Sequence, residues 1–362
     1  MKVGSTVLIA VLASVIAVVA VAIVIMSSDH TDTPVDPDKP VYPAGISFDE
    51  RTGTLRSSRA VDWEITSELP MFIERETKQH SGNSVKLETG LYTVKVGSDE
   101  FNVIVGGTVH RDVSYEYFHK GEKFPVSVGY DIDISELSKL TMENREWNRN
   151  TNYEFMDAPR LAYVDDTVRS IEAQLATRFK EIGGSVDDRQ DYADFLAGFA
   201  QLGIVYPEKI YNMADYKVWG LSEYWALSIE TLYHICGDCE DSSAVACALF
   251  VAAGYDAAMV GVPYHVTAGV HLDSFVLRDP DEFASYNSLS KLFVPASAPS
   301  VVEGDPQDII YYGVDTTEGQ APVGYLLSGS AKTLGEKTLY WGTAGFYPVR
   351  TQTDDGGIQG PS

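Results

Sequence analysis

The sequence is 362 residues long, and 44% of these residues are apolar, which is ordinary for a soluble globular protein of about two domains. Its charge is strongly negative, because 52 acidic side chains face 27 basic ones and the formal net charge is −25. Such a surface repels nucleic acid and anionic lipid headgroups, so nucleic acid is excluded as a main partner.

The N-terminal residues 3–26 form an apolar run without a charged side chain. As a helix this run would be about 36 Å long, enough for a hydrocarbon core of ~30 Å. A cleavable signal peptide has a shorter apolar region followed by small residues, whereas Ala22 is followed by further apolar residues. Lys2 precedes the run and several aspartates follow it, which favours a cytoplasmic N-terminus. We therefore expect a single-pass membrane anchor at residues 1–26, with the remaining chain extracytoplasmic.

The next two segments differ sharply in composition. Residues 27–43 are rich in Asp, Thr and Pro, which is typical of a stalk that packs no core. Residues 44–113 show β patterns, and the alternating runs 91–96 and 101–105 flank a short polar turn, which predicts a hairpin. We expect a small β-sandwich here, serving as a spacer or docking module without chemistry of its own.

Helical periodicity appears in the following segment, residues 114–350. Apolar side chains recur at three- and four-residue spacing over 165–182, which predicts a helix, and a second helix is expected over 192–202. A short strand is expected at 124–128. The polar, Gly-rich residues 351–362 predict a disordered tail.

The three cysteines, Cys236, Cys239 and Cys247, lie within twelve residues, and such a small odd cluster is not a disulfide framework. Gly237 permits a sharp turn, and Asp238 is a good N-cap for a helix that runs to Ala253 before Gly254. Asp241, three residues after the cap, strengthens this start signal. The helix is apolar all round, so we expect it to be buried, with Cys239 in its first turn.

A helix N-terminus suits a reactive cysteine. Its partial positive charge and free amide N–H groups favour the thiolate and can stabilise an oxyanion. Glu240 and Asp241 oppose this effect, because nearby carboxylates raise the pKa of a thiol, so a histidine partner is needed. Cys247, two turns further along, is expected to be core.

Two later strands supply a histidine and a carboxylate. His265 and His271 lie on the same face of a predicted strand but about 20 Å apart, so only one of them can reach Cys239. A strand over 309–315 ends in Asp315. If it pairs antiparallel with the histidine strand, Asp315 lies beside His265 and far from His271. This arrangement predicts His265 as base and Asp315 as the carboxylate that orients it.

Three motifs in this order resemble the transglutaminase-like superfamily, above all its membrane-associated archaeal and bacterial members. They are GDCED at 237–241, PYHVTAGV at 263–270 and YYGVDTT at 311–317. The resemblance implies an α+β, papain-like fold, with a nucleophile helix packed on an antiparallel sheet. It also implies a thioester acyl-enzyme that is resolved by water in a peptidase or amidase, or by an amine in a cross-linking enzyme. Of the two, hydrolysis is favoured because water is abundant outside the cell.

The chain departs from the family pattern at two places. Tyr264 stands where the family often has glycine before the histidine, and its ring would narrow a cleft. The stretch from 273 to 308 is long enough for a lid or an insertion. Trp225, upstream of the nucleophile, could line the cleft or assist the oxyanion, although a core position is the simpler interpretation.

Other functions stay open at this point. Cys236 and Cys239 form a C-x-x-C at a helix start, which is typical of redox proteins, and a disulfide between them would silence the nucleophile. A catalytically inactive binding module is a second alternative. A metal site built from the cysteines lacks a convincing second ligand pair. No cofactor is implied, calcium at the acidic surface stays open, and the expected substrate is a protein or peptide at the cell surface.

Overall fold

The structure is a computed structural model of the chain, with mixed α and β architecture. It describes residues 42–69, 76–207, 215, 218–262, 265–278, 293–295, 297–299, 310–317, 319–327 and 345–349. In these ranges no helix is long and apolar enough to cross a membrane. The predicted anchor at 1–26, most of the stalk, Tyr264 and the tail at 351–362 lie outside them.

An antiparallel five-stranded sheet comes first in the chain. Its strands are β1 (Ile46–Asp49), β2 (Thr54–Ser67), β3 (Thr77–Lys86), β4 (Gly90–Val96) and β5 (Asp99–Val105). The predicted hairpin is confirmed, because β4 and β5 pair from Val96 opposite Asp99. The pairing joins all five strands into one sheet. β2 is long enough to pair with β1 through residues 54–57 and with β4 through residues 63–67, while β3 pairs with both parts of β2.

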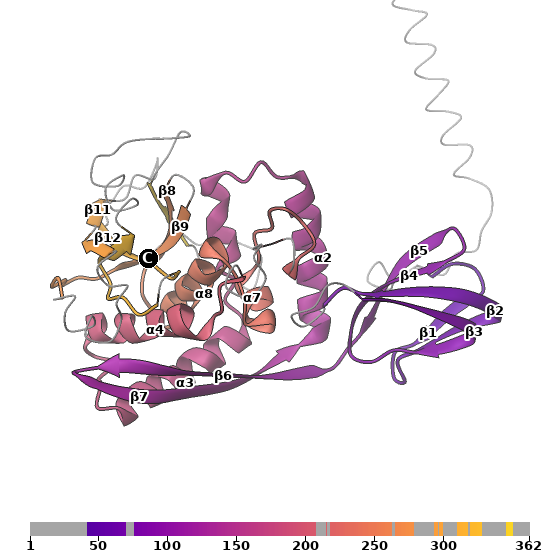
Figure 1. Cartoon of the computed structure of the whole chain (residues 1–362), viewed down its shortest axis with the longest axis horizontal. Coiled ribbons are helices and arrows are strands. Elements are labelled where there is room, and N and C mark those ends of the chain that lie inside the picture. Colours follow the sequence, from indigo (N-terminus) through magenta and orange to yellow (C-terminus); the bar gives the residue numbers. More distant parts are fainter. Residues whose placement is uncertain are drawn as a thin grey trace, which may run out of the picture. The chain divides into compact units, whose positions relative to one another are not determined.

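A long hairpin follows, formed by β6 (Thr108–His119) and β7 (Glu122–Asp133). The domain boundary predicted at residue 113 falls inside β6, and the first sheet ends at Val105. Lys120 and Gly121 both have positive φ, at 49° and 86°, which suits a tight two-residue turn. As Figure 1 shows, the hairpin runs along α3 and α4, with β7 against α3 and β6 against α4.

The helices follow the predicted periodicity. They are α2 (Ile134–Asn150), the short 3₁₀ helix η1 (Phe155–Leu161), α3 (Asp166–Glu181), α4 (Arg189–Gly203), α7 (Ser228–His234) and α8 (Cys239–Ala252). The helix predicted over 165–182 is α3, with its start capped by the Asp165 carboxylate. The one predicted over 192–202 is α4, which begins earlier because Asp188 caps the backbone N–H of Asp191.

The second large sheet carries the candidate chemistry. Its strands are β8 (Ala257–Val262), β9 (His265–His271), β10 (Phe293–Pro295), β11 (Ser297–Pro299), β12 (Ile310–Val314), β13 (Tyr325–Leu327) and β14 (Gly345–Pro348). The order is β10-β13-β12-β9-β8-β14, with β11 beside β12. β9 and β12 are antiparallel, with Tyr311 opposite His271 and Val314 opposite Ala268, so the predicted pairing is confirmed.

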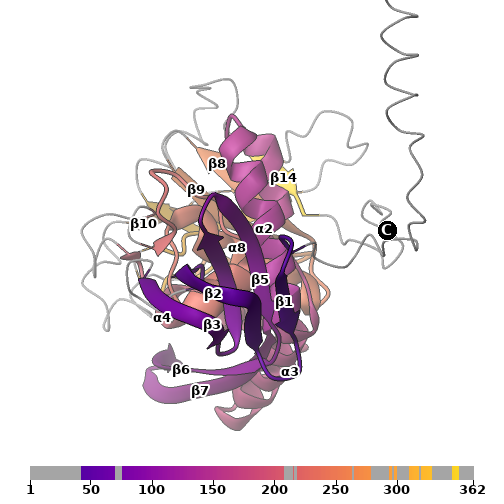
Figure 2. The same cartoon turned by 90° about the vertical axis from the view of Figure 1, so that its right-hand side faces the viewer.

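Helix α8 lies at the centre of the packing. It contacts β8 and β9 on one side and α3, α4 and α7 on others, and both views show it beside β9 (Figures 1 and 2). Its residues from Glu240 to Phe250 are buried, as expected from a helix that is apolar all round. Cys239, the nucleophile candidate, is therefore the first residue of a helix that is packed on all sides.

Candidate active site

The turn before α8 is built around Gly237. A Cβ atom at this position would lie 2.5 Å from Cβ of Asp241 and 2.8 Å from Cγ2 of Thr231, so no larger residue fits without a shift. Asp238 takes the predicted N-cap position, but its side chain does not cap the helix. The carboxylate of Asp241 instead accepts a hydrogen bond from the backbone N–H of Ala226, at 2.8 Å. This bond ties the loop before α7 to the first turn of α8.

Cys239 is the first residue of α8 and is half-buried, with its Sγ 3.1 Å from Oε2 of Glu240. The other two thiols are fully buried. Burial raises the pKa of Cys236 and of Cys247 to about 12, and for Cys236 the nearby aspartates add to this effect. No disulfide joins Cys236 to Cys239 in the structure, and all three cysteines are free. Cys239 is thus the thiol with access to a reactant.

His265 begins β9 and lies between the thiol and a carboxylate. Its Nε2 is 3.2 Å from Oδ2 of Asp315, and the thiol of Cys239 lies close enough to influence the imidazole. Burial alone would lower the pKa of His265, but the interactions with Asp315 and with Cys239 raise it to about 10. The imidazole is therefore protonated at neutral pH and can give a proton to a leaving group.

Asp315 follows β12 and is fully buried. Its Oδ1 accepts hydrogen bonds from the backbone N–H of Thr317 at 3.1 Å and from the Thr317 hydroxyl at 2.7 Å. These bonds leave Oδ2 directed at His265. The structure thus brings Cys239, His265 and Asp315 together, while His271 lies at the far end of β9 and bonds the carbonyl of Ile310.

Polar side chains on α4 hold the segment after Asp315. Gln201 donates to the carbonyls of Asp315 and Ala321, at 2.8 and 2.9 Å, and accepts from the N–H of Ala321. Asp194 accepts from the N–H of Val323 at 2.6 Å. Neither residue was predicted from the sequence. The available signal was two polar side chains, seven residues apart and thus on one face, in a helix that is otherwise largely apolar from Tyr192 onwards.

Trp225 is placed in the core. It is 4% exposed, packs against Trp147 and Tyr153, and donates its indole N–H to Oε1 of Glu223 at 2.9 Å. This N–H is therefore already used and does not serve an oxyanion. Tyr264, the other residue predicted for the cleft, lies outside the described residues.

A cluster of carboxylates surrounds the start of α8. It comprises Asp215, Glu223, Asp238, Glu240 and Asp241. Burial raises the pKa of Asp238 to about 6 and that of Asp215 to about 9, and the nearby Asp238 carboxylate contributes to the second shift. Burial also places the pKa values of Glu240 and Asp241 well above their usual range. The sequence showed the acidic neighbours of Cys239, but Asp215 and Glu223 carried no signal that they join them.

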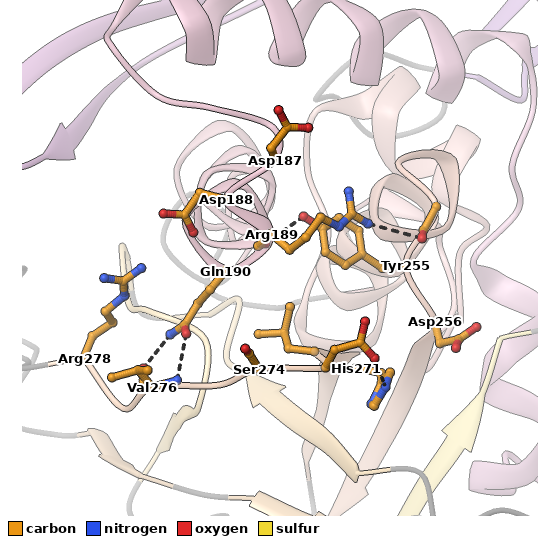
Figure 3. Close-up of a pocket in the computed structure, with 13 residues that line it drawn as sticks. Asp187, Asp188, Arg189, Gln190, Tyr255, Asp256, His271, Ser274, Val276 and Arg278 are labelled. Carbon is orange, nitrogen blue, oxygen red and sulfur yellow. Dashed lines mark hydrogen bonds and ion pairs between the residues drawn. The ribbon is translucent and has the colours of Figure 1, made fainter.

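A pocket of about 650 Å³ lies elsewhere, at the start of α4 and the end of β9. Figure 3 shows Gln190 reaching across it to the backbone of Val276. His271, Arg189 and Arg278 also line it, but no member of the Cys239–His265–Asp315 group does. We therefore locate the candidate chemistry by the geometry of the side chains rather than by the size of this pocket.

Comparison of the chain with protein-family models, with curated proteins and with solved structures finds no match.

Proposed function

We propose that the chain is a cysteine hydrolase, a peptidase or amidase, whose catalytic residues are Cys239, His265 and Asp315. One observation carries the proposal: at the N-terminus of a buried helix, the thiol of Cys239 lies close enough to His265 to influence its pKa, and His265 in turn bonds the buried carboxylate of Asp315. This is the geometry in which a nucleophile, a base and an orienting group act as a unit. The order of motifs that resembles the transglutaminase-like superfamily supports the same assignment.

The proposed reaction follows from these positions. The Cys239 thiolate attacks the carbonyl carbon of an amide, the C–N bond breaks, and His265 gives its proton to the leaving amine. The product is a thioester between Cys239 and the acyl group. Water then attacks the thioester while the now neutral His265 takes one of its protons. The C–S bond breaks, releasing a carboxylic acid and restoring the thiolate and imidazolium pair.

The start of α8 supplies the electrostatics for these steps. The backbone N–H of Cys239 belongs to the first turn of a helix, where amide N–H groups have no partner within the helix. Such a group can donate to the oxyanion that forms when the carbonyl is attacked. Asp315 keeps the imidazole oriented and stabilises its charged form, and the bonds from Thr317 hold Asp315 in turn.

The proposal also covers the cellular location of the protein and the class of its substrate. The apolar residues 3–26 would anchor the chain in a membrane, with the catalytic part extracytoplasmic and facing proteins or peptides at the cell surface. An open aqueous surrounding favours hydrolysis of the thioester. Transfer of the acyl group to an amine, as in a cross-linking enzyme, is the alternative outcome at the same residues.

The test is the rate at which iodoacetamide alkylates each cysteine of the reduced protein at neutral pH, read by mass spectrometry. Cys239 should react at least about 100-fold faster than Cys236 and Cys247, which are buried internal standards with raised pKa values. His265→Ala should slow labelling of Cys239 at least about tenfold, because the cation that stabilises the thiolate is gone. Asp315→Asn should slow it less, because Asp315 acts through His265.

Substrate hydrolysis gives the second readout. Cys239→Ala and His265→Ala should each lose about 10³-fold or more of any amide hydrolysis, and the double variant no more than either, because the residues act as a unit. If all three thiols react equally slowly, Cys239 is a packed structural residue and the chain is a binding module. Adding a primary amine separates the two enzyme classes, since only an acyltransferase forms the amide adduct.

A further inference from the structure

Three buried hydroxyl groups join the first turns of α8 to the segment that carries Asp315. Ser242 and Ser243 belong to α8 and are 2% and 0% exposed, and both face Thr316, which is 4% exposed. The hydroxyl oxygen of Thr316 is 2.8 Å from that of Ser242 and 3.1 Å from that of Ser243. Thr316 lies between Asp315 and Thr317, which bond each other, while its own hydroxyl bonds the nucleophile helix.

The Ser242 hydroxyl also donates to the carbonyl oxygen of Asp238, at 2.6 Å, and the backbone N–H of Ser242 donates to the same oxygen at 3.0 Å. A hydroxyl has one proton, so Ser242 accepts from Thr316 when it gives its own proton to Asp238. Thr316 in turn accepts from Ser243, whose other contact, to the carbonyl of Val266, is longer at 3.5 Å. The protons of the three hydroxyls then run in one direction and end on a backbone carbonyl. Hydrogen bonds in such a chain polarise one another.

The carbonyl of Asp238 and the backbone N–H of Cys239 belong to one peptide unit. A trans peptide unit is planar, and its C=O and N–H point in opposite directions. Fixing the carbonyl therefore fixes the direction of the N–H, which points out of the N-terminal end of α8. This N–H is the oxyanion donor of the proposed reaction. Hydrogen bonds to the carbonyl also draw electron density from the amide nitrogen, which strengthens the N–H as a donor.

We propose that Ser242 and Thr316 are positioning residues for the oxyanion donor. Ser242 holds the peptide unit between Asp238 and Cys239, and Thr316 holds the hydroxyl of Ser242. The same two hydroxyls join the start of the nucleophile helix to the segment of the orienting carboxylate, so the oxyanion donor and the imidazole keep their places relative to each other. The inference rests on the proposed function, because the N–H of Cys239 has this role only in acyl transfer.

The experiment compares two reactions of Cys239 in the full-length chain, held in a mild detergent at neutral pH. Acetylation by p-nitrophenyl acetate passes through an oxyanion, because the thiolate attacks the ester carbonyl before p-nitrophenolate leaves. Alkylation by iodoacetamide displaces iodide from a saturated carbon and forms no oxyanion. The first reaction is followed as the burst of p-nitrophenolate above the background of Cys239→Ala, and the second by mass spectrometry. The ratio of the two rates isolates the effect of the oxyanion donor.

Removing the hydroxyl of Ser242 tests the first link. Ser242→Ala should slow acetylation at least about tenfold, part of the loss of about 10²–10³-fold that follows when an oxyanion donor is removed outright. It should change alkylation less than about twofold, because that reaction needs no such donor. Ser228→Ala is the matched control, since Ser228 is 0% exposed and also donates to a backbone carbonyl, that of Tyr163 at 2.5 Å, but belongs to α7. Equal acetylation rates in the two variants and the parent would overturn the proposal.

Two variants at Thr316 test the second link, also if Ser242→Ala fails to fold. Thr316→Val keeps the shape of the side chain without its hydroxyl, and it should slow acetylation severalfold with little change in alkylation. Thr316→Ser keeps the hydroxyl and should bring acetylation back to within about twofold of the parent rate. An equal loss of both reactions in Thr316→Val would count against this role, because it would mean that Thr316 acts through Asp315 and the imidazole.

The outcomes separate this inference from the proposed function. Alkylation of Cys239 no faster than that of Cys236 and Cys247 in the parent, together with no burst of p-nitrophenolate, would contradict the proposed function and the inference with it. Fast alkylation and a clear burst in the parent, with the same ratio of the two rates in Ser242→Ala and Thr316→Val, would contradict the inference alone.

Discussion

Two buried aspartates, Asp315 and Asp194, differ in the hydrogen-bond partners that surround their carboxyl groups. Asp315 and Asp194 are both almost fully buried, yet Asp315 faces a histidine and two donors from Thr317. Asp194 has one backbone donor, from Val323, and an oxygen without a donor among the described residues. Burial raises the pKa of Asp194 to about 8, so this carboxyl group is neutral near pH 7. The first aspartate thus faces a histidine, whereas the second serves as a hydrogen-bonding group for one backbone N–H.

The raised pKa of Asp194 should make the free energy of unfolding depend on pH. Its pKa is 3.8 in a model peptide and about 8 when folded, so the folded chain holds a proton between these pH values that the unfolded chain releases. This contribution to stability is complete below about pH 4 and is lost as the pH rises towards 8. A neutral amide at the same position would not titrate. The unfolding midpoint of Asp194→Asn, measured against the parent, should therefore rise between about pH 5 and pH 9.

If the difference in unfolding midpoint between Asp194→Asn and the parent were the same at about pH 5 and about pH 9, this prediction would be contradicted, because Asp194 would then ionise alike in the folded and unfolded states.

The raised pKa of Asp194 could not be predicted from the sequence. An aspartate in an apolar helix signals burial, but the single donor that it meets comes from Val323, a residue 129 positions away. The approach of His265 to Asp315 was easier to predict, because the antiparallel pairing of β9 and β12 places the start of one strand beside the end of the other.

At the scale of elements, α4 uses two glutamines in the same way at its two ends. Gln201 clamps the backbone of Asp315 and Ala321, and Gln190 clamps the N–H and carbonyl of Val276 (Figure 3). Both are 6% exposed. Only the first clamp adjoins the catalytic carboxylate, so the pair separates the effect of a clamp on stability from its effect on the site.

Gln201→Leu and Gln190→Leu should each lower the free energy of unfolding by about 1–3 kcal/mol, because buried backbone groups lose their partners. Gln201→Leu should also slow alkylation of Cys239 severalfold, since the Asp315 backbone is released and the orientation of His265 is lost. Gln190→Leu should leave that rate unchanged. Both quantities come from denaturant titration and mass spectrometry of the same samples. Equal labelling rates in the two variants would show that the Gln201 clamp is structural only.

Elements themselves were easier to predict than their assembly. The hairpin of β4 and β5, the helices α3, α4 and α8, and the antiparallel pairing of β9 and β12 follow from periodicity and turn residues. The sequence pattern did not show that β2 is long enough to pair with three strands of the first sheet. The sequence also did not show that the Asp238 side chain leaves the helix uncapped, or that Asp241 accepts from the Ala226 N–H of a different segment.

At the scale of the whole molecule, the first sheet contributes to the same apolar core as the part that carries the candidate site. Leu69 and Leu91 belong to the same apolar cluster as α8, and from Pro43 onwards the chain forms one unit. A buried ion pair reinforces the junction, with Arg145 of α2 bonded to the carboxylate and the carbonyl of Glu68. Arg111 of β6 also donates to the carbonyl of Tyr233, at 2.8 Å.

Arg145→Met should lower the free energy of unfolding by about 3–5 kcal/mol, because a buried carboxylate loses the charge that faces it. Adding Glu68→Gln should restore at least half of this loss. The matched control is Lys95→Met, which breaks an exposed pair with Glu100 at 3.1 Å and should cost less than about 1 kcal/mol. Denaturant titration measures all four proteins. A loss in Arg145→Met no larger than in Lys95→Met would contradict the role given to the buried pair.

The tip of the β6–β7 hairpin has a consequence for how the protein reaches its active form. Gln320, five residues after Asp315, bonds both the N–H and the carbonyl of Phe118, across 202 positions of chain. Contacts of such sequence separation form slowly, because a long loop must close before they can stabilise anything. Helices and local hairpins can form earlier, so the segment that carries Asp315 is expected to be among the last parts to settle. On the proposed function, a newly made chain would remain inactive until segments far apart in its sequence had met.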